Sequence, residues 1–146
     1  MDLRIAPLSA EDKAAWELLA RGYKAFYQTE IPPSEYEAAW NRLQQGGEVR
    51  GMGAKVNGEL VGIAHYIFHA STWAPAVCYL QDLFVAPHAR GQGVARALIE
   101  AVAEAARERG ARRYYWHTLE HNTVARALYD KVARFHGFLR YDVALE

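Results

Sequence analysis

The sequence predicts a mixed α/β fold, in which a mostly antiparallel sheet contains one parallel pair of strands and carries helices on both faces. Asn57-Gly58 lies between two apolar segments and is typical of a tight antiparallel hairpin. Residues 76–118 have the pattern of a strand, a helix and a second strand, which predicts parallel strands joined by a helical crossover. Further helical patterns precede the hairpin and follow the crossover, so both faces of the sheet can be covered.

The first segment predicts a strand followed by a helix. Residues 3–6 alternate briefly between apolar and polar side chains, as a half-buried strand does. Ser9 and Asp12 have the spacing of a capping box, in which a side chain at each end of the first turn accepts a backbone N–H. The apolar spacing that follows predicts a helix that ends near Gly22.

The next segment predicts a second helix and the two strands of the hairpin. Ser34 and Glu37 form another capping-box pattern, and apolar residues then recur at helical spacing until Gly46. Residues 49–56 and 60–69 are rich in strand-forming side chains and are the predicted antiparallel pair.

The C-terminal half predicts three strands and two helices. Residues 76–85 and 113–118 are the expected parallel strands, and residues 93–109 are the helix that connects them. Asn122 is the expected N-cap of the last helix. Residues 138–145 alternate between apolar and polar and predict a closing strand.

Length and composition limit the class of protein. The 146 residues suit a single domain, residues 1–146, with hydrophobic residues at 51% and charged residues at 23%. A net charge of zero argues against nonspecific binding to nucleic acid. The sequence has no apolar stretch typical of a membrane span, no ligand spacing typical of a metal site, and one cysteine, Cys78. We therefore expect a cytoplasmic protein without membrane, nucleic-acid or metal partners.

The junction at residues 90–95 is the strongest functional signal. An apolar strand ends at a proline, and Arg90-Gly91-Gln92-Gly93 then leads directly into a helix. Backbone N–H groups and the positive end of the helix dipole point at one spot, and a side chain at Gly91 or Gly93 would hold phosphate oxygens away from them. No Lys-Ser/Thr pair follows the glycines, and Arg96 replaces the third glycine of a dinucleotide fingerprint. The junction therefore predicts a site for a phosphate-bearing cofactor of another kind.

These motifs resemble those of the GNAT N-acetyltransferase superfamily. Residues 90–95 match its Arg/Gln-x-x-Gly-x-Gly/Ala signature, and residues 82–87 are similar to its fourth strand. Residues 115–118 and 122–131 are similar to its fifth strand and the helix after it. The resemblance implies the GNAT (acyl-CoA N-acyltransferase) fold, with the parallel strands splayed apart. It also implies acetyl-CoA (CoA) as cofactor, with the pantetheine arm between those strands.

The resemblance also implies which residues bind the cofactor. The strand backbone would pair with the pantetheine arm, the loop would hold the diphosphate, and the last helix would contact the arm and an outer phosphate. The implied residues are Leu83, Phe84, Val85, Arg90, Gly91, Gln92, Gly93, Val94, Ala95, Asn122, Ala125, Tyr129 and Lys131.

Acetyl transfer to an amine needs a neutral amine and a protonated or stabilised thiol leaving group. Tyr129 lies about two turns after Asn122, where family members place a tyrosine, and is the expected general acid. Asp82 interrupts an apolar strand and is the expected residue for the substrate amine, as binder or base. Related polyamine enzymes carry a glutamate where this chain has Gln81, so Glu30 and a water chain remain alternative bases.

The acceptor side is expected to be aromatic and to include one histidine. Its predicted residues are Tyr27, Glu30, His65, Trp73, Gln81 and Asp82. We expect acetyl transfer to a primary amine of a small molecule, such as a polyamine or amino acid, in a ternary complex. A protein or peptide N-acetyltransferase and a noncatalytic acyl-CoA-binding module are the alternatives. A homodimer through the C-terminal strand or exposed aromatic side chains is also expected.

Overall fold

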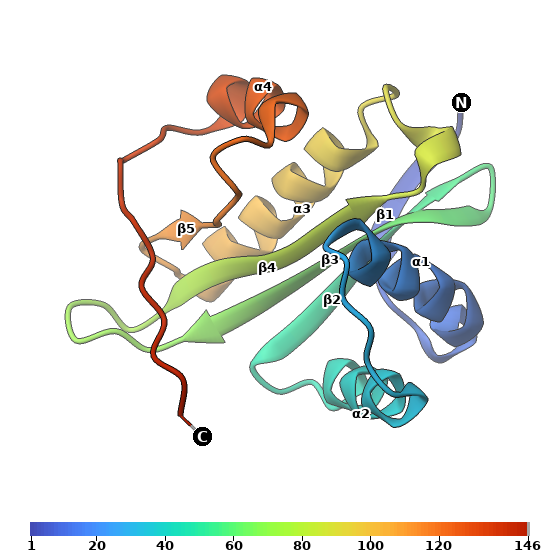
Figure 1. Ribbon diagram of the computed structural model, residues 1–146, viewed down its shortest axis with the longest axis horizontal. Helices are drawn as coiled ribbons and strands as arrows, with labels where there is room; N and C mark the ends of the chain where they lie inside the picture. Colours follow the sequence, from blue (N-terminus) through green and yellow to red (C-terminus); the bar gives the residue numbers. More distant parts are fainter. Residues whose placement is uncertain (146) are drawn as a thin grey trace.

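The computed structural model describes residues 1–145 and contains one five-stranded sheet in the order β1-β2-β3-β4-β5 (Figure 1). All neighbouring strands are antiparallel except β4 and β5, which are parallel. The strands are β1 (Leu3–Pro7), β2 (Val49–Val56), β3 (Glu59–His69), β4 (Val77–Val85) and β5 (Tyr114–Tyr115). The predicted mixed sheet with one parallel pair is therefore confirmed.

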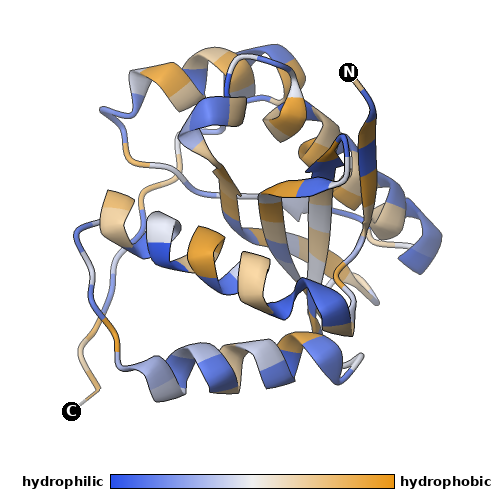
Figure 2. Ribbon diagram, turned by 90° about the vertical axis from the view of Figure 1, so that its right-hand side faces the viewer, coloured by the Kyte–Doolittle hydropathy of each residue, from blue (hydrophilic) through white to orange (hydrophobic). Residues whose placement is uncertain are grey.

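Helices cover both faces of the sheet, as predicted. On one face, α1 (Lys13–Phe26), preceded by the short turn η1 (Ala10–Asp12), and α2 (Pro33–Gln44) pack around Trp16 and Trp40. On the other face, α3 (Val94–Arg109), preceded by the short turn η2 (Pro87–Ala89), and α4 (Thr123–Val132) pack on the second core. Figure 2 shows hydrophilic and hydrophobic residues alternating along the helices, as expected for helices that bury one side against a sheet.

The local signals set several boundaries closely. Asn57 and Gly58 have φ values of 51° and 87°, the left-handed pair that a two-residue hairpin requires. The carboxylate of Asp12 accepts the backbone N–H of Ser9 at 2.9 Å, which confirms this part of the predicted capping box. The connecting helix α3 starts one residue after its predicted position and ends where predicted.

Two helix ends differ from the prediction. The helix α1 continues to Phe26 instead of ending near Gly22, because Gly22 and the ring of Tyr23 pack against Phe84 of β4. The helix α2 begins at Pro33, so Ser34 is inside the helix and is not its cap. Proline suits the first helical position because its missing N–H would have had no partner there. Glu37 instead accepts from Lys13 Nζ at 2.7 Å.

The parallel ladder is much shorter than the predicted strand 113–118. It contains two residue pairs, Cys78 with Tyr114 and Tyr79 with Tyr115. Beyond Tyr79, β4 continues to Val85 with no β5 partner, because the two strands diverge. Residues 116–118 therefore leave the sheet, and the implied splay between the two strands is confirmed.

The predicted closing strand at residues 138–145 is wrong for the structure of a single chain. These residues follow α4 as an irregular segment whose large apolar side chains lie in solvent. Alternation predicts a strand only where an edge is available, and the register pairs no described strand with this segment. Its exposed residues include Phe138, Leu139, Tyr141, Val143 and Leu145.

Candidate active site

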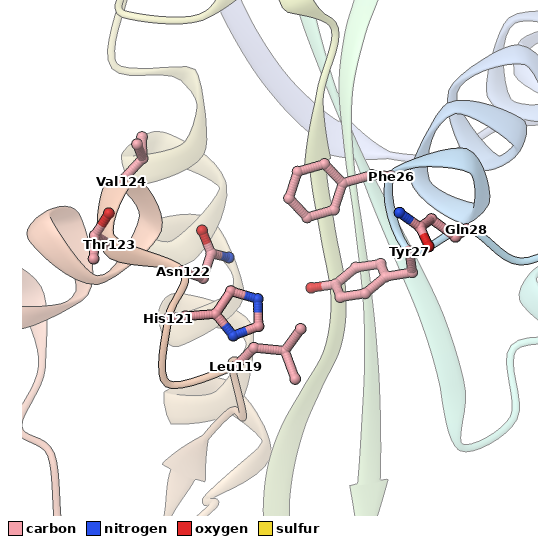
Figure 3. A pocket seen from close by; sticks show the side chains of 8 residues that line it. All are labelled: Phe26, Tyr27, Gln28, Leu119, His121, Asn122, Thr123 and Val124. Atoms are coloured by element: carbon pink, nitrogen blue, oxygen red, sulfur yellow. The ribbon is translucent and has the colours of Figure 1, made fainter.

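Beyond Tyr79, the unpaired part of β4 separates from the chain that follows β5. A pocket of about 420 Å³ lies beside this gap, between the end of α1 and the loop that enters α4 (Figure 3). Tyr27 and Phe26 reach toward the pocket from one side, and His121 and Asn122 reach toward it from the other. The lining residues are Phe26, Tyr27, Gln28, Leu119, His121, Asn122, Thr123 and Val124. The pocket therefore combines elements from opposite faces, which only a divided sheet allows.

The predicted phosphate loop has the geometry of an anion site. Gly91 and Gly93 have φ values of 77° and 81°, which favour glycine, and a Cβ at either position would meet no atom within 4 Å. No side chain caps the helix at Gly93, and the backbone bond from Ala97 to Gly93 closes its first turn. The first turn of α3 therefore has no side-chain cap, and Gly91 and Gly93 leave open space at this positive helix end, as a diphosphate site requires.

Arg90 holds this loop against the end of β4. Its Nε donates to the carbonyl oxygen of Val85 at 2.9 Å, and its guanidinium lies 5.4 Å from the centroid of the Phe84 ring. Arg90 therefore positions the loop in addition to bringing a positive charge. The same bond occupies the Val85 carbonyl, one of the backbone groups expected to pair with the pantetheine arm.

Gly93→Ala should weaken CoA binding about tenfold, because the added methyl group enters the space in front of the loop and strains a positive φ. Gly46→Ala is the matched control, because Gly46 has a φ of 69° and equally open surroundings at the end of α2. Calorimetry with CoA should show weaker binding for Gly93→Ala alone. Equal affinities for the two variants would contradict the assignment of the loop.

A β-bulge places Asp82 on the α1 face of the sheet. His65 pairs with Asp82 and Tyr66 pairs with Leu80, so Gln81 is an extra residue between them. The bulge shifts the alternation of side chains. Leu80 still points to the α3 core, Gln81 is exposed, and Asp82 joins His65 on the opposite face.

Asp82 is held as a carboxylate. His65 Nδ1 lies 2.9 Å from its Oδ2, and the two side chains are 13% and 25% exposed. Burial alone would raise the pKa of Asp82. The hydrogen bonds from His65 and Tyr23 and the charge of Lys24 together have a larger, opposite effect, so the pKa lies below its usual value. Asp82 is therefore ionised at neutral pH and suits a cationic partner.

Glycine at position 22 brings α1 close to this carboxylate. A Cβ there would lie 2.9 Å from the ring of Phe84, so the helix approaches β4 more closely than a larger residue would permit. The turn that follows carries Tyr23 toward Asp82. Burial, followed by the nearby carboxylate, raises the pKa of the Tyr23 hydroxyl well above 10, so this group remains a donor.

Tyr129 lies on the other side of the gap. Its ring is edge-on to Trp116, with centroids 5.4 Å apart. Burial and the nearby Tyr27 raise the pKa of Tyr129, so the phenol stays protonated at neutral pH. Tyr27 follows the end of α1 and Tyr129 belongs to α4, so the pKa of Tyr129 responds to a residue from the helix on the other face of the sheet.

The helix α4 separates the other predicted cofactor residues. Asn122 is its N-cap and donates from Nδ2 to Thr118 Oγ1 at 3.2 Å, and Ala125 is half-buried in the first turn. Lys131 is exposed in the last turn, about 13 Å along the helix axis from Asn122. Asn122 and Ala125 therefore lie at the pocket end of the helix, and Lys131 lies at its far end.

Two predicted acceptor residues lie apart from Asp82. Glu30 is exposed in the loop after α1 and lines a separate pocket with Arg21 and Tyr36. Trp73 is 89% exposed on the loop between β3 and β4. That loop is at the opposite end of β4 from residues 90–95 (Figure 1). The nine residues of β4 span about 25 Å.

An aromatic cluster around Tyr79, which lies near Asp82, was not predicted from the sequence. Tyr79 and Tyr115 stack with centroids 5.1 Å apart, and His117 Nδ1 lies 3.3 Å from the Tyr79 hydroxyl. The alternation in residues 113–118 could have placed Tyr115 and His117 on one face. No sequence pattern predicts that Trp16 takes part in the site, because its hydrogen bond is to His65, 49 residues away in the sequence.

Comparison with protein families identifies this arrangement. The model of the Acetyltransferase (GNAT) family matches residues 13–135. The chain belongs to the GNAT acetyltransferase family. The predicted family is therefore confirmed, and its match covers residues 90–95, the parallel strand pair and Tyr129.

Curated relatives show that this GNAT protein is an N-acetyltransferase. It is 35% identical over 134 residues to the D-amino-acid N-acetyltransferase HPA3 of Saccharomyces cerevisiae, a match that covers 88% of this chain and 83% of the relative. It is 37% identical over 84 residues to a thialysine N-epsilon-acetyltransferase of Caenorhabditis elegans, over 58% of this chain and 52% of that one.

Solved structures share the GNAT fold across almost the whole chain. The aminoglycoside acetyltransferase AAC(6')-Iy in complex with a bisubstrate CoA analogue has a TM-score of 0.88, with 19% identity over 99% of both chains. The ribosomal-protein-alanine N-acetyltransferase of Brucella melitensis biovar Abortus 2308 has a TM-score of 0.84, with 23% identity over 99% of this chain and 100% of the other. In residues 1–145 of this GNAT enzyme, no helix is long and apolar enough to cross a membrane.

Proposed function

We propose that the enzyme transfers the acetyl group of acetyl-CoA directly to a primary amine of a small molecule within a ternary complex. The observation that carries this proposal is the ionised, partly buried Asp82 beside a divided sheet that leads to an uncapped helix N-terminus. The two relatives with D-amino-acid and thialysine in their names support a small amine, such as an amino acid or polyamine.

The residues present fit acetyl-CoA. The loop at Gly91 and Gly93 offers free backbone donors and open space for the diphosphate, and β4 beyond Tyr79 offers an edge without a β5 partner for an amide-bearing arm. When bound, the cofactor supplies a thioester, whose acetyl group an amine can attack. Asn122 and Ala125 would lie beside the arm, and Arg90 would keep the loop in register with the strand.

Asp82 would bind the acceptor as its ammonium ion and orient it toward the gap. Neutralising an alkyl amine of pKa ~10 at pH 7 costs about 4 kcal/mol. Asp82 is a weak base because its pKa lies below the usual range, so this chain gives it a binding role. The amine proton then leaves through water on the open side of the pocket before the nitrogen attacks.

Tyr129 would donate a proton to the sulfur that leaves. Its raised pKa keeps the phenol protonated throughout the neutral range, and it faces the same gap as Tyr27. A free thiolate of pKa about 8.5 is a moderate leaving group, and a positioned donor stabilises the charge that develops on it.

Thiol release from acetyl-CoA with a panel of amines tests this function. The panel should contain D- and L-amino acids, lysine analogues, polyamines and a lysine-containing peptide. We expect amine-dependent release with at least one small amine. Release with the peptide alone would instead indicate a peptide N-acetyltransferase, and CoA binding without release would indicate a noncatalytic acyl-CoA-binding module.

The pH dependence of kcat/KM should be set by the acceptor amine. Asp82 has a pKa below its usual value and stays ionised across the neutral range, and Tyr129 has a raised pKa and stays protonated there. Across this range kcat/KM should rise with pH as the amine loses its proton. A falling limb between pH 6 and 9 would contradict the role of Tyr129.

We also propose that the enzyme forms a homodimer through its C-terminal segment. The exposed apolar residues of 138–145 could together bury about the 800 Å² per partner that a stable interface requires. Light scattering should give twice the chain mass for the full chain and a single chain mass after truncation at Arg134. An equal mass for both would contradict the proposed dimer.

The buried free thiol of Cys78 also suits a cytoplasmic location.

A further inference from the structure

A chain of two hydrogen bonds runs from α1 through β3 to the carboxylate on β4. Trp16 Nε1 donates to His65 Nε2 at 2.9 Å, and His65 Nδ1 lies 2.9 Å from Asp82 Oδ2. Trp16 is 1% exposed and packs against Trp40 with ring centroids 5.1 Å apart. The hydrogen bonds between Trp16, His65 and Asp82 therefore connect a buried aromatic core to the predicted acceptor site.

The chemistry of the first partner fixes where the protons lie. An indole N–H can only donate, so His65 Nε2 accepts and carries no hydrogen. The ring hydrogen is then on Nδ1, which donates to the carboxylate of Asp82. His65 is consequently held as one neutral tautomer. Its single lone pair on Nε2 is already used, so His65 is not available as a base for the acceptor.

We propose that Trp16 and His65 are positioning residues, which hold Oδ2 of Asp82 so that the carboxylate meets the acceptor ammonium in one orientation. This inference rests on the proposed function, in which Asp82 binds the amine. A carboxylate that follows a bulge on a strand edge needs such support, because bulges weaken the local ladder. A carboxylate fixed in this way holds the bound amine close to the orientation from which it attacks, which lowers the entropic cost of reaching the transition state.

Substitutions at both positions test this role by kinetics. Trp16→Phe keeps an aromatic ring but removes the donor, and should raise the acceptor KM about tenfold with a smaller change in kcat. Trp40→Phe is the matched control, because it removes similar volume from the same cluster without removing the bond to His65. An unchanged acceptor KM in Trp16→Phe, or an equal rise in Trp40→Phe, would overturn the proposal.

A conservative substitution separates positioning from packing at position 65. The side-chain nitrogen of asparagine can occupy the place of His65 Nδ1 and donate to Asp82, whereas leucine cannot donate. His65→Asn keeps the bond to Asp82 but loses the bond from Trp16, so its acceptor KM should rise about as much as that of Trp16→Phe, and His65→Leu, which loses both bonds, should show a larger rise. Equal KM values for both variants would contradict the role of the bond.

Nitrogen NMR of histidine-labelled protein tests the hydrogen bonds without turnover. The native protein should show a protonated Nδ1 and a hydrogen-bonded, unprotonated Nε2 for His65. Trp16→Phe should shift the Nε2 signal, because that nitrogen loses its donor, and should leave Nδ1 protonated beside Asp82. Loss of acetyl transfer to every amine would reject the proposed function, while this tautomer would still establish the hydrogen-bonded chain. A protonated Nε2 in an enzyme that acetylates amines would reject the inference alone.

Discussion

Tyr129→Phe should lower kcat about 100-fold while the affinity for CoA stays within about twofold. The substitution removes one hydroxyl and keeps the ring that packs edge-on against Trp116. The phenol has a raised pKa because it is buried near Tyr27, so the native enzyme presents a proton donor at every neutral pH. Steady-state kinetics with the best amine, together with calorimetry for CoA, would separate the two effects.

Tyr114→Phe provides the matched control for this experiment. Tyr114 is also part-buried, but its hydroxyl donates to the backbone oxygen of Ile99 at 3.0 Å, on the α3 side of β5. Its loss should reduce the free energy of unfolding by about 1 kcal/mol and leave kcat unchanged. If Tyr129→Phe retained native kcat, Tyr129 would be a packing residue and the acid would have to be sought elsewhere.

Asp82→Asn should raise the acceptor KM about 10- to 100-fold, with a smaller effect on kcat and none on CoA affinity. Asparagine has nearly the same shape, and its side-chain oxygen can still accept from His65 Nδ1. The substitution therefore removes the negative charge without removing the bond that supports the side chain. Initial rates over a range of acceptor concentrations would measure the change.

Asp2→Asn is a suitable control for the loss of one acidic group. Asp2 is exposed near the N-terminus and pairs with Arg4 at 3.3 Å, so its removal should leave both Michaelis constants unchanged. An acceptor KM that is native in Asp82→Asn would leave Asp82 with a structural role beside His65. The proposed acceptor site would then lose its anchor.

Features encoded over short stretches of sequence were predicted well. The hairpin at Asn57-Gly58, the loop at residues 90–95 and the helix α3 each depend on backbone preferences of neighbouring residues. The family resemblance rested on the same stretches, so the sequence also predicted where the loop at residues 90–95 and Tyr129 lie in the fold. Their chemical roles remain proposals.

Features that depend on distant partners could not be predicted. The bulge at Gln81 follows from the register between β3 and β4, and it decides which side chain faces the α1 side. The bond between Trp16 and His65 joins residues 49 positions apart. Residues 116–118 and 138–145 have strand-like composition, but strand formation also requires an edge to pair with.

The two-pair ladder between β4 and β5 makes the C-terminal part of the fold weakly attached. None of the residues in α4 is fully buried, so few contacts hold β5 and α4 against the rest of the molecule. A ligand that bridges both strands would supply the missing cross-links. At a free concentration 100 times its dissociation constant, such a ligand would add about 2.7 kcal/mol to the free energy of unfolding of the protein. Cofactor and polypeptide would then melt as one cooperative unit, and the supply of cofactor would influence how long the protein survives proteolysis.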